Sequence, residues 1–387
     1  MMKKTLLAAA ALLWSLSAGA AEDPSLAPYI RGYDAFRNGD FAAAAAEYRK
    51  AAEQGSAAAQ YALGALYRDG HGVQKDPAEE AAWFRRAADQ GFASAQFHLG
   101  TMYRDGRGVQ QDYGEAAKWL RKGADQDHAF SRISLAMLYR DGTGVSRDYG
   151  EAVRLLKGPA EQSYASAEFA LGMMYRDGTG VPQDSGEALK WIQKSADKRY
   201  DEAMFALGMM YRDGRGVPQS FQEAVKWFRK AAEQKHSEAQ FALGVIYEKG
   251  QWVTQSYPEA MRWYRRAAKQ DHARAQLALG MMYANGTGVS KNYSEAEKWF
   301  RTAADLGHPS AQFSLAVLCE SGQGLPQDLP QAFLWFSLSA ARSTGNLHDS
   351  AMAARERVAK KLTPRQLEEG MKAAAEWKPK EKECCPQ

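Results

Sequence analysis

Residues 165–200 read ASAEFALGMMYRDGTGVPQDSGEALKWIQKSADKRY, and this pattern returns every 36 residues along the chain. Its Leu-Gly pair, the tyrosine three residues later and the tryptophan of its second half all recur at this spacing. The tyrosine column consists of Tyr67, Tyr103, Tyr139, Tyr175, Tyr211, Tyr247 and Tyr283. Eight consecutive frames without an insertion indicate a repeat architecture, which decides the fold before any other feature.

Each repeat is predicted to form two helices. Small and apolar residues recur at helical spacing in 165–176, and the glycines Gly178 and Gly180 are expected to end that helix. The second helix is predicted to begin at Asp184, because Asp184 and Glu187 match the spacing of a capping box. The same pairing recurs at Asp76/Glu79, Asp112/Glu115, Asp148/Glu151, Ser220/Glu223, Ser256/Glu259 and Asn292/Glu295.

The recurring pattern Ala-x-x-x-Leu-Gly-x-x-Tyr-x-x-Gly-x-Gly-Val-x-x-Asp-x-x-x-Ala-x-x-Trp-Phe-x-x-Ala-Ala resembles the Sel-one-like repeat, a relative of the tetratricopeptide repeat with a longer loop. The resemblance covers eight units over residues 56–343. It implies an all-α fold, a right-handed superhelical α-solenoid of helix-loop-helix repeats whose first helices line a concave face. Residues 26–55 lack the glycine loop and resemble an ordinary tetratricopeptide pair, so they are expected to cap the N-terminal end. Residues 346–377 are expected to form two helices that close the C-terminal end.

Residues 1–20 have the features of a signal peptide. Two lysines precede an apolar run over residues 5–16, and Ala18-Gly19-Ala20 supplies small residues for cleavage after Ala20. No cysteine follows the run, which excludes a lipoprotein anchor. We therefore expect an exported protein, periplasmic or secreted, with no transmembrane segment after cleavage.

The cysteines do not form a disulfide scaffold. Cys319 lies in the tyrosine column and is expected to be a buried, inert thiol. Cys384 and Cys385 lie in a charged tail, residues 378–387, which is expected to be disordered. We expect a monomer, with a disulfide-linked dimer through Cys384 and Cys385 as the alternative.

The sequence offers no catalytic, metal or cofactor site. A net charge of +4 without a basic, aromatic-interleaved stripe does not indicate nucleic acid as a partner. Metal is not expected either, because planar residues replace histidine in some frames and successive repeats lie too far apart for ligand distances of ~2 Å. The column concerned contains Phe92, His128, Tyr164, Tyr200, His236, His272 and His308.

A candidate partner-binding surface lies on the first helix of each repeat, which carries an aromatic or aliphatic column, a methionine-rich column and an arginine column. Aromatic residues, methionine and arginine are enriched in interface cores, and methionine suits an adaptable surface. As alternatives, the aromatic and methionine columns are partly buried packing, and each arginine pairs with the following aspartate. The predicted binding residues are Phe97, Phe169, Phe205, Phe241, Met137, Met173, Met209, Met281, Arg104, Arg140, Arg176, Arg212 and Trp252.

Trp252 marks the one frame in which the second loop glycine is replaced by a bulky residue. Because a positive φ is unfavourable for such a residue, the loop is expected to differ in shape from the others. Trp252 is then either an exposed anchor for a partner or a filler between neighbouring loops.

These features predict a non-enzymatic scaffold or adaptor that binds protein or peptide through the concave face. One alternative, implied by a cysteine-rich secreted branch of the resembling family, is an enzyme that binds or hydrolyses β-lactams, although this chain lacks the cysteine pair in each repeat. A second alternative is a secreted factor that engages a host protein.

Overall fold

A computed structural model describes residues 24–380, which contain twenty helices and no strand. The chain divides into two compact units between Ser195 and Ala196, close to the end of one helix. The predicted signal peptide and Cys384-Cys385 lie outside the described residues. In the part described, the chain is an all-α solenoid of helix-loop-helix repeats, as the sequence predicts.

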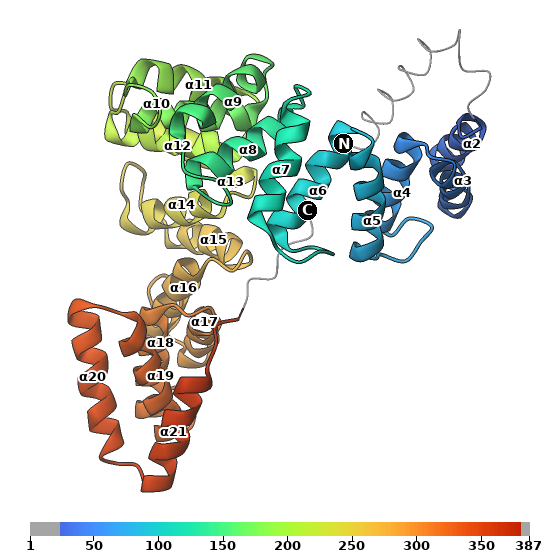
Figure 1. The fold of residues 1–387 in the computed structure, drawn as a ribbon. Coiled ribbons are helices and arrows are strands. Elements are labelled where there is room, and N and C mark those ends of the chain that lie inside the picture. Colours follow the sequence, from blue (N-terminus) through green and yellow to red (C-terminus); the bar gives the residue numbers. More distant parts are fainter. Residues whose placement is uncertain (1–23, 381–387) are drawn as a thin grey trace. The chain divides into compact units, whose positions relative to one another are not determined.

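The first unit contains the helices drawn from blue to green in Figure 1. They are α2 (Leu26–Arg37), α3 (Phe41–Glu53), α4 (Ala57–Asp69), α5 (Pro77–Asp89), α6 (Ala93–Asp105), α7 (Tyr113–Ala124), α8 (Ala129–Asp141), α9 (Tyr149–Glu161), α10 (Ala165–Asp177) and most of α11 (Ser185–Asp197).

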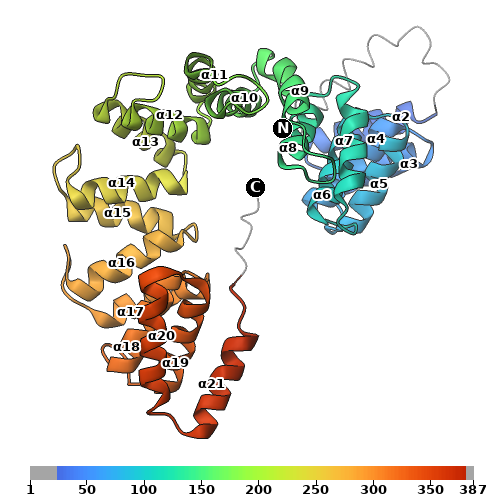
Figure 2. The same ribbon diagram turned by 60° about the vertical axis from the view of Figure 1, so that its left-hand side comes forward.

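The second unit continues to the C-terminus, and Figure 2 shows its helices stacked in chain order. They are α12 (Asp201–Asp213), α13 (Phe221–Glu233), α14 (Ser237–Lys249), α15 (Tyr257–Ala268), α16 (Ala273–Asn285), α17 (Tyr293–Asp305), α18 (Pro309–Ser321), α19 (Leu329–Arg342), α20 (Gly345–Ala359) and α21 (Pro364–Glu376).

The even-numbered helices α4 to α18 are the first helices of the repeats, here called helices A, and the helices that follow them are helices B. Each helix A ends at a glycine in the left-handed region. In α14 this residue is Gly250, with φ 64°. The Leu-Gly glycine lies where helices A and B cross. A Cβ atom on Gly244 would lie 2.4 Å from the Tyr264 ring, so only glycine allows this close approach.

The capping box predicted for helices B is only half formed. Asp148 accepts a hydrogen bond from the backbone N–H of Glu151, as expected. The Glu151 carboxylate, however, binds Arg154 one turn along the helix instead of returning to the cap. An exposed cation three residues away competes for the carboxylate in most repeats, and the pairs are Glu115/Lys118, Glu151/Arg154, Glu187/Lys190, Glu223/Lys226, Glu259/Arg262 and Glu295/Lys298.

The C-terminal helices α20 and α21 pack against α19, where a Cβ atom on Gly370 would lie 2.8 Å from the Phe333 ring. The chain that follows is attached to the repeats: Lys380 binds Asp305 through its backbone N–H, at 2.8 Å, and through its ammonium group, at 2.7 Å. The segment predicted to be disordered from Lys378 is thus held at Lys380, and residues 381–387 lie outside the described part.

Candidate functional site

The aromatic column of helices A takes part in packing between repeats. In the second unit, the Phe205 ring stacks on the His236 ring of the next repeat, with centroids 4.7 Å apart, and lies 5.5 Å from the Phe228 ring of its own helix B. Phe241 repeats this arrangement with His272 and Tyr264. The predicted residues of this column are half-buried, and they are Phe97, Phe169, Phe205 and Phe241.

The histidine column caps helices A. The Nδ1 atoms of His128, His236 and His272 accept hydrogen bonds from backbone N–H groups at the helix start, as N-cap side chains do. Burial lowers the pKa of His128 and of His236, which favours the neutral form that this role requires. Within residues 24–380, no group of three or more His, Cys, Asp or Glu side chains is placed to hold a metal ion.

The methionine column is more exposed than the aromatic column in two repeats of the second unit. Met137, Met173 and Met209 are half-buried, whereas 42% of the Met281 side chain is exposed. Val317 occupies the same column one repeat later and is 39% exposed. Among the large apolar side chains of the described part, few are this accessible, and these two occupy the same column on α16 and α18.

The arginine column consists of internal ion pairs. Arg176 binds the following Asp177 through two parallel hydrogen bonds, from Nε to Oδ1 at 2.7 Å and from Nη2 to Oδ2 at 3.0 Å. This confirms the predicted pairing of each arginine with the next aspartate. The column therefore presents neutral pairs to a partner, and the four predicted members are Arg104/Asp105, Arg140/Asp141, Arg176/Asp177 and Arg212/Asp213.

The prediction of a differently shaped loop at Trp252 is wrong. Trp252 has φ 64°, close to the 72° of Gly288 in the same position one repeat later. The Trp252 ring stacks on the Phe221 ring, with centroids 4.4 Å apart and an interplanar angle of 5°, at the start of α13. This aromatic contact offsets the unfavourable backbone conformation, and Trp252 both fills the space between elements and remains 37% exposed.

Comparison with known proteins agrees with this architecture. The Sel1 repeat model matches residues 29–56, 57–92, 93–128, 129–157, 165–200, 201–236, 237–272, 273–308 and 309–343. The chain belongs to the Sel1 repeat family. The nine matched segments include one, residues 29–56, in the part where we expected a tetratricopeptide-like cap. Sel1 repeat proteins are generally non-catalytic scaffolds that mediate protein interactions.

Two solved structures resemble this Sel1 repeat protein over most of its length. A Sel1 repeat protein from Oxalobacter formigenes is 33% identical, with a TM-score of 0.61, over 79% of this chain and 90% of its own. A protective antigen of uropathogenic Escherichia coli strains is 30% identical, with a TM-score of 0.53, over 91% of this chain and 84% of its own. No curated protein matches the sequence.

A glutamine column of this Sel1 repeat protein was not singled out from the sequence. The Gln240 side chain donates to the Ala232 carbonyl at the end of the preceding helix B, at 2.9 Å, and accepts from Gln270 at 2.8 Å. Its signal was present, because glutamine recurs at the repeat period. The glutamines that bind the preceding helix in this way are Gln60, Gln96, Gln240, Gln276 and Gln312.

Proposed function

We propose that this protein is a non-enzymatic scaffold that binds a protein or peptide through its helices A. The observation that carries the proposal is the exposure of two large apolar side chains, Met281 and Val317, at the same position of consecutive helices A in the second unit. Exposed apolar side chains that recur on one kind of helix are a feature of interaction surfaces.

The packing of the aromatic column supports the same proposal. Phe241, held between His272 and Tyr264, fixes the base of the surface, so that a partner meets a preorganised support. Met209 and Met281, on the helices A before and after that of Phe241, are flexible side chains that adapt to a partner's shape. Arg212, on the same helix as Met209, contributes orientation, because its charge is already matched by Asp213.

Replacing two methionines of this column, the exposed Met281 and the half-buried Met209, tests the proposal. The double variant Met209→Gln, Met281→Gln is expected to bind a peptide selected from a random display library at least tenfold more weakly than the unaltered protein. A tenfold loss corresponds to about 1.4 kcal/mol, a modest effect for two side chains at the centre of an interface. The measurement is isothermal titration calorimetry with the selected peptide.

Met371→Gln is the matched control. Met371 lies on α21, which packs on α19, and is 57% exposed, so the same change of residue alters accessible apolar surface on a helix that is not a helix A. The control is expected to bind the selected peptide normally. Equal binding by the double variant and the control would refute a role for the helix A surface.

We also propose that the protein is exported and cleaved after Ala20. The predicted signal peptide supports this proposal. The likeness to a protein described as a protective antigen also supports it, because an antigen that protects has to be accessible to the immune system. Along residues 24–380, no helix combines the length and apolar character needed to cross a membrane.

N-terminal sequencing of the mature protein tests export. The expected sequence begins Ala21-Glu22-Asp23, because signal peptidase cleaves after small residues. Recovery of the mature chain from medium or periplasm distinguishes the two destinations. An intact N-terminus on protein found only in the cytoplasm would contradict the proposal.

A further inference from the structure

The glutamine column is interrupted once within the second unit, at Met204. In the next repeat, Gln240 joins the preceding helix B to Gln270 of its own helix B. Met204 stands at the corresponding position of α12 and can make neither hydrogen bond. In the described part of the chain, no hydrogen-bond partner is found for the Gln234 side chain, which corresponds to Gln270.

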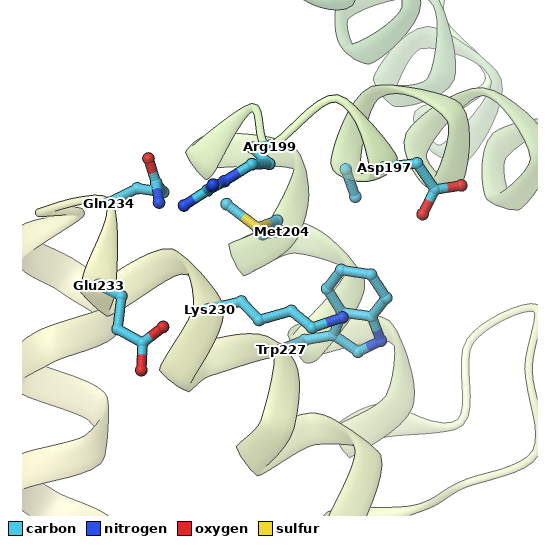
Figure 3. Close-up of a pocket in the computed structure, with 8 residues that line it drawn as sticks. Asp197, Arg199, Met204, Trp227, Lys230, Glu233 and Gln234 are labelled. Carbon is cyan, nitrogen blue, oxygen red and sulfur yellow. The ribbon is translucent and has the colours of Figure 1, made fainter.

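A cavity of about 310 Å³ lies at this interruption (Figure 3). That volume is at the small end of the range for ligand sites, and it fits one amino-acid residue better than a longer segment. All of its lining residues belong to the second unit, and they are Ala196, Asp197, Arg199, Met204, Trp227, Lys230, Glu233 and Gln234.

The cavity combines polar donors with an apolar floor. In Figure 3 the Arg199 guanidinium extends toward Gln234 over the Met204 side chain. Lys230 lies across the Trp227 ring, with its ammonium 3.7 Å from the ring centroid. No ion-pair partner of Arg199 is found among residues 24–380, so its donors are free for a ligand. The carboxylates of Asp197 and Glu233 also line the cavity and keep it from being purely cationic.

The position of Arg199 is costly for the backbone. Arg199 has φ 64° in the turn between α11 and α12, a conformation that side chains other than glycine rarely adopt. The corresponding turn residues of the other repeats also have positive φ, and they are Gly55, Gly91, Asp127, Ser163, Lys235, Asp271 and Gly307. The turn accepts several residue types and does not itself require an arginine, and the Arg199 side chain lines the only interruption of the glutamine column in the second unit.

We infer that this cavity binds the α-carboxylate of an apolar amino acid, either free or at the C-terminus of a peptide. Arg199 and Gln234 donate hydrogen bonds to the carboxylate, an arrangement for which a guanidinium is well suited. Met204 and Trp227 contact the apolar side chain. In a free amino acid, the ammonium group pairs with Glu233. This site is separate from the surface of helices A described above.

Calorimetric titration with four probes tests the inference on the full mature chain. They are phenylalanine, N-acetylphenylalanine, an acetylated tetrapeptide that ends in phenylalanine, and N-acetylphenylalanine amide. The carboxylates are expected to bind and the amide to bind at least tenfold more weakly. Tightest binding of phenylalanine assigns the site to free amino acids, and tightest binding of the tetrapeptide assigns it to peptide ends. No difference between the amide and its acid overturns the inference.

Two variants locate the binding and keep the fold intact. Met204→Gln introduces the glutamine that the following three repeats have at this position, so the new side chain can bind the Ala196 carbonyl and Gln234 and fill the cavity. Arg199→Gly introduces a glycine at this turn, the residue type found at the corresponding position Gly55. Each is expected to weaken carboxylate binding at least tenfold without lowering the thermal unfolding midpoint, and binding unchanged in both overturns the inference.

Lys235→Gly is the matched control. Lys235 occupies the same turn one repeat later, also with positive φ, at 70°, but there Gln240 completes the glutamine column. Carboxylate binding is expected to be unchanged in this variant, and a loss as large as that in Arg199→Gly contradicts the assignment. Peptide capture by the helix A surface is expected to persist in the cavity variants, so failure of one proposal is distinguishable from failure of the other.

Discussion

Gly108→Ala is expected to lower the free energy of unfolding of the first unit by about 3 kcal/mol, one of the largest effects of a single methyl group in this chain. A Cβ atom at Gly108 would lie 1.9 Å from the Pro77 carbonyl oxygen, a backbone atom that cannot rotate away. The residue also has φ 69°, which is unfavourable for alanine. Urea denaturation followed by circular dichroism measures the loss.

Gly39→Ala separates the steric effect from the conformational one. Gly39 has φ 81°, but a Cβ atom there would meet nothing within 4 Å. Only the conformational effect remains, so the expected loss is about 1 kcal/mol. Equal losses in the two variants would show that close approach between the loop and the preceding helix B does not limit this position.

Acidification is expected to destabilise the protein through half-buried histidines, and His98 has the largest expected share. Burial lowers the pKa of His98 to about 3, with Arg68 and Arg107 adding in the same direction. The folded state therefore binds fewer protons than the unfolded state below the ordinary pKa of about 6.5. The contribution of His98 to the free energy of unfolding is fully present above that pH. It falls as the pH drops toward 3, with a loss of about 2 kcal/mol at pH 5.

The control for this pH dependence is His98→Ala. Alanine occupies the same column at Ala170 and Ala206, so the fold tolerates it there. Unfolding curves measured between pH 7 and pH 5 are expected to show a smaller loss in the variant. A residual loss remains, because burial also lowers the pKa of His128, His236 and His308. The same pH dependence in both proteins would contradict the assignment to His98.

The repeat period predicted the fold well because the residues that recur in it are required by local contacts, such as helix crossing and helix capping. Gly244 permits close helix crossing, and Asp148 caps a helix B; each role depends on contacts within one repeat or with its neighbour. Cys319 is likewise buried as predicted, and its burial raises the pKa of the thiol to about 11. Such short-range requirements recur at a fixed spacing and are therefore readable from one sequence.

The features that were predicted wrongly or missed depend on a contact with a residue of a neighbouring repeat, and the pattern within one column does not identify that residue. The conformation of Trp252 depends on stacking with Phe221 in the preceding repeat. Glu80 replaces an alanine in a buried column and is 1% exposed, and it is accommodated by two hydrogen bonds from Arg107 in the next loop. Trp252 and Glu80 are each visible in the sequence as an exception to their column. The residues that stabilise them, Phe221 and Arg107, lie one repeat away.

The candidate surface illustrates the same limit. The sequence brought together Phe205, Met209 and Arg212 on one helix, and it left packing and binding as alternatives for them. The structure shows that the phenylalanine ring and the arginine already have partners within the protein and that Met209 is half-buried, whereas the same column is exposed at Met281. Amphipathic periodicity does not distinguish these cases, because repeat-to-repeat contacts decide which side chains stay open.

Site-specific photo-crosslinking tests most directly whether a partner binds on helices A. The photoreactive residue p-benzoylphenylalanine is placed at Met281 in one protein and at Met371 in another, two exposed methionine positions on different helices. With the library-selected peptide bound, adducts are expected from position 281 and not from position 371. Adducts from position 371 with none from position 281 would contradict binding through the surface of helices A.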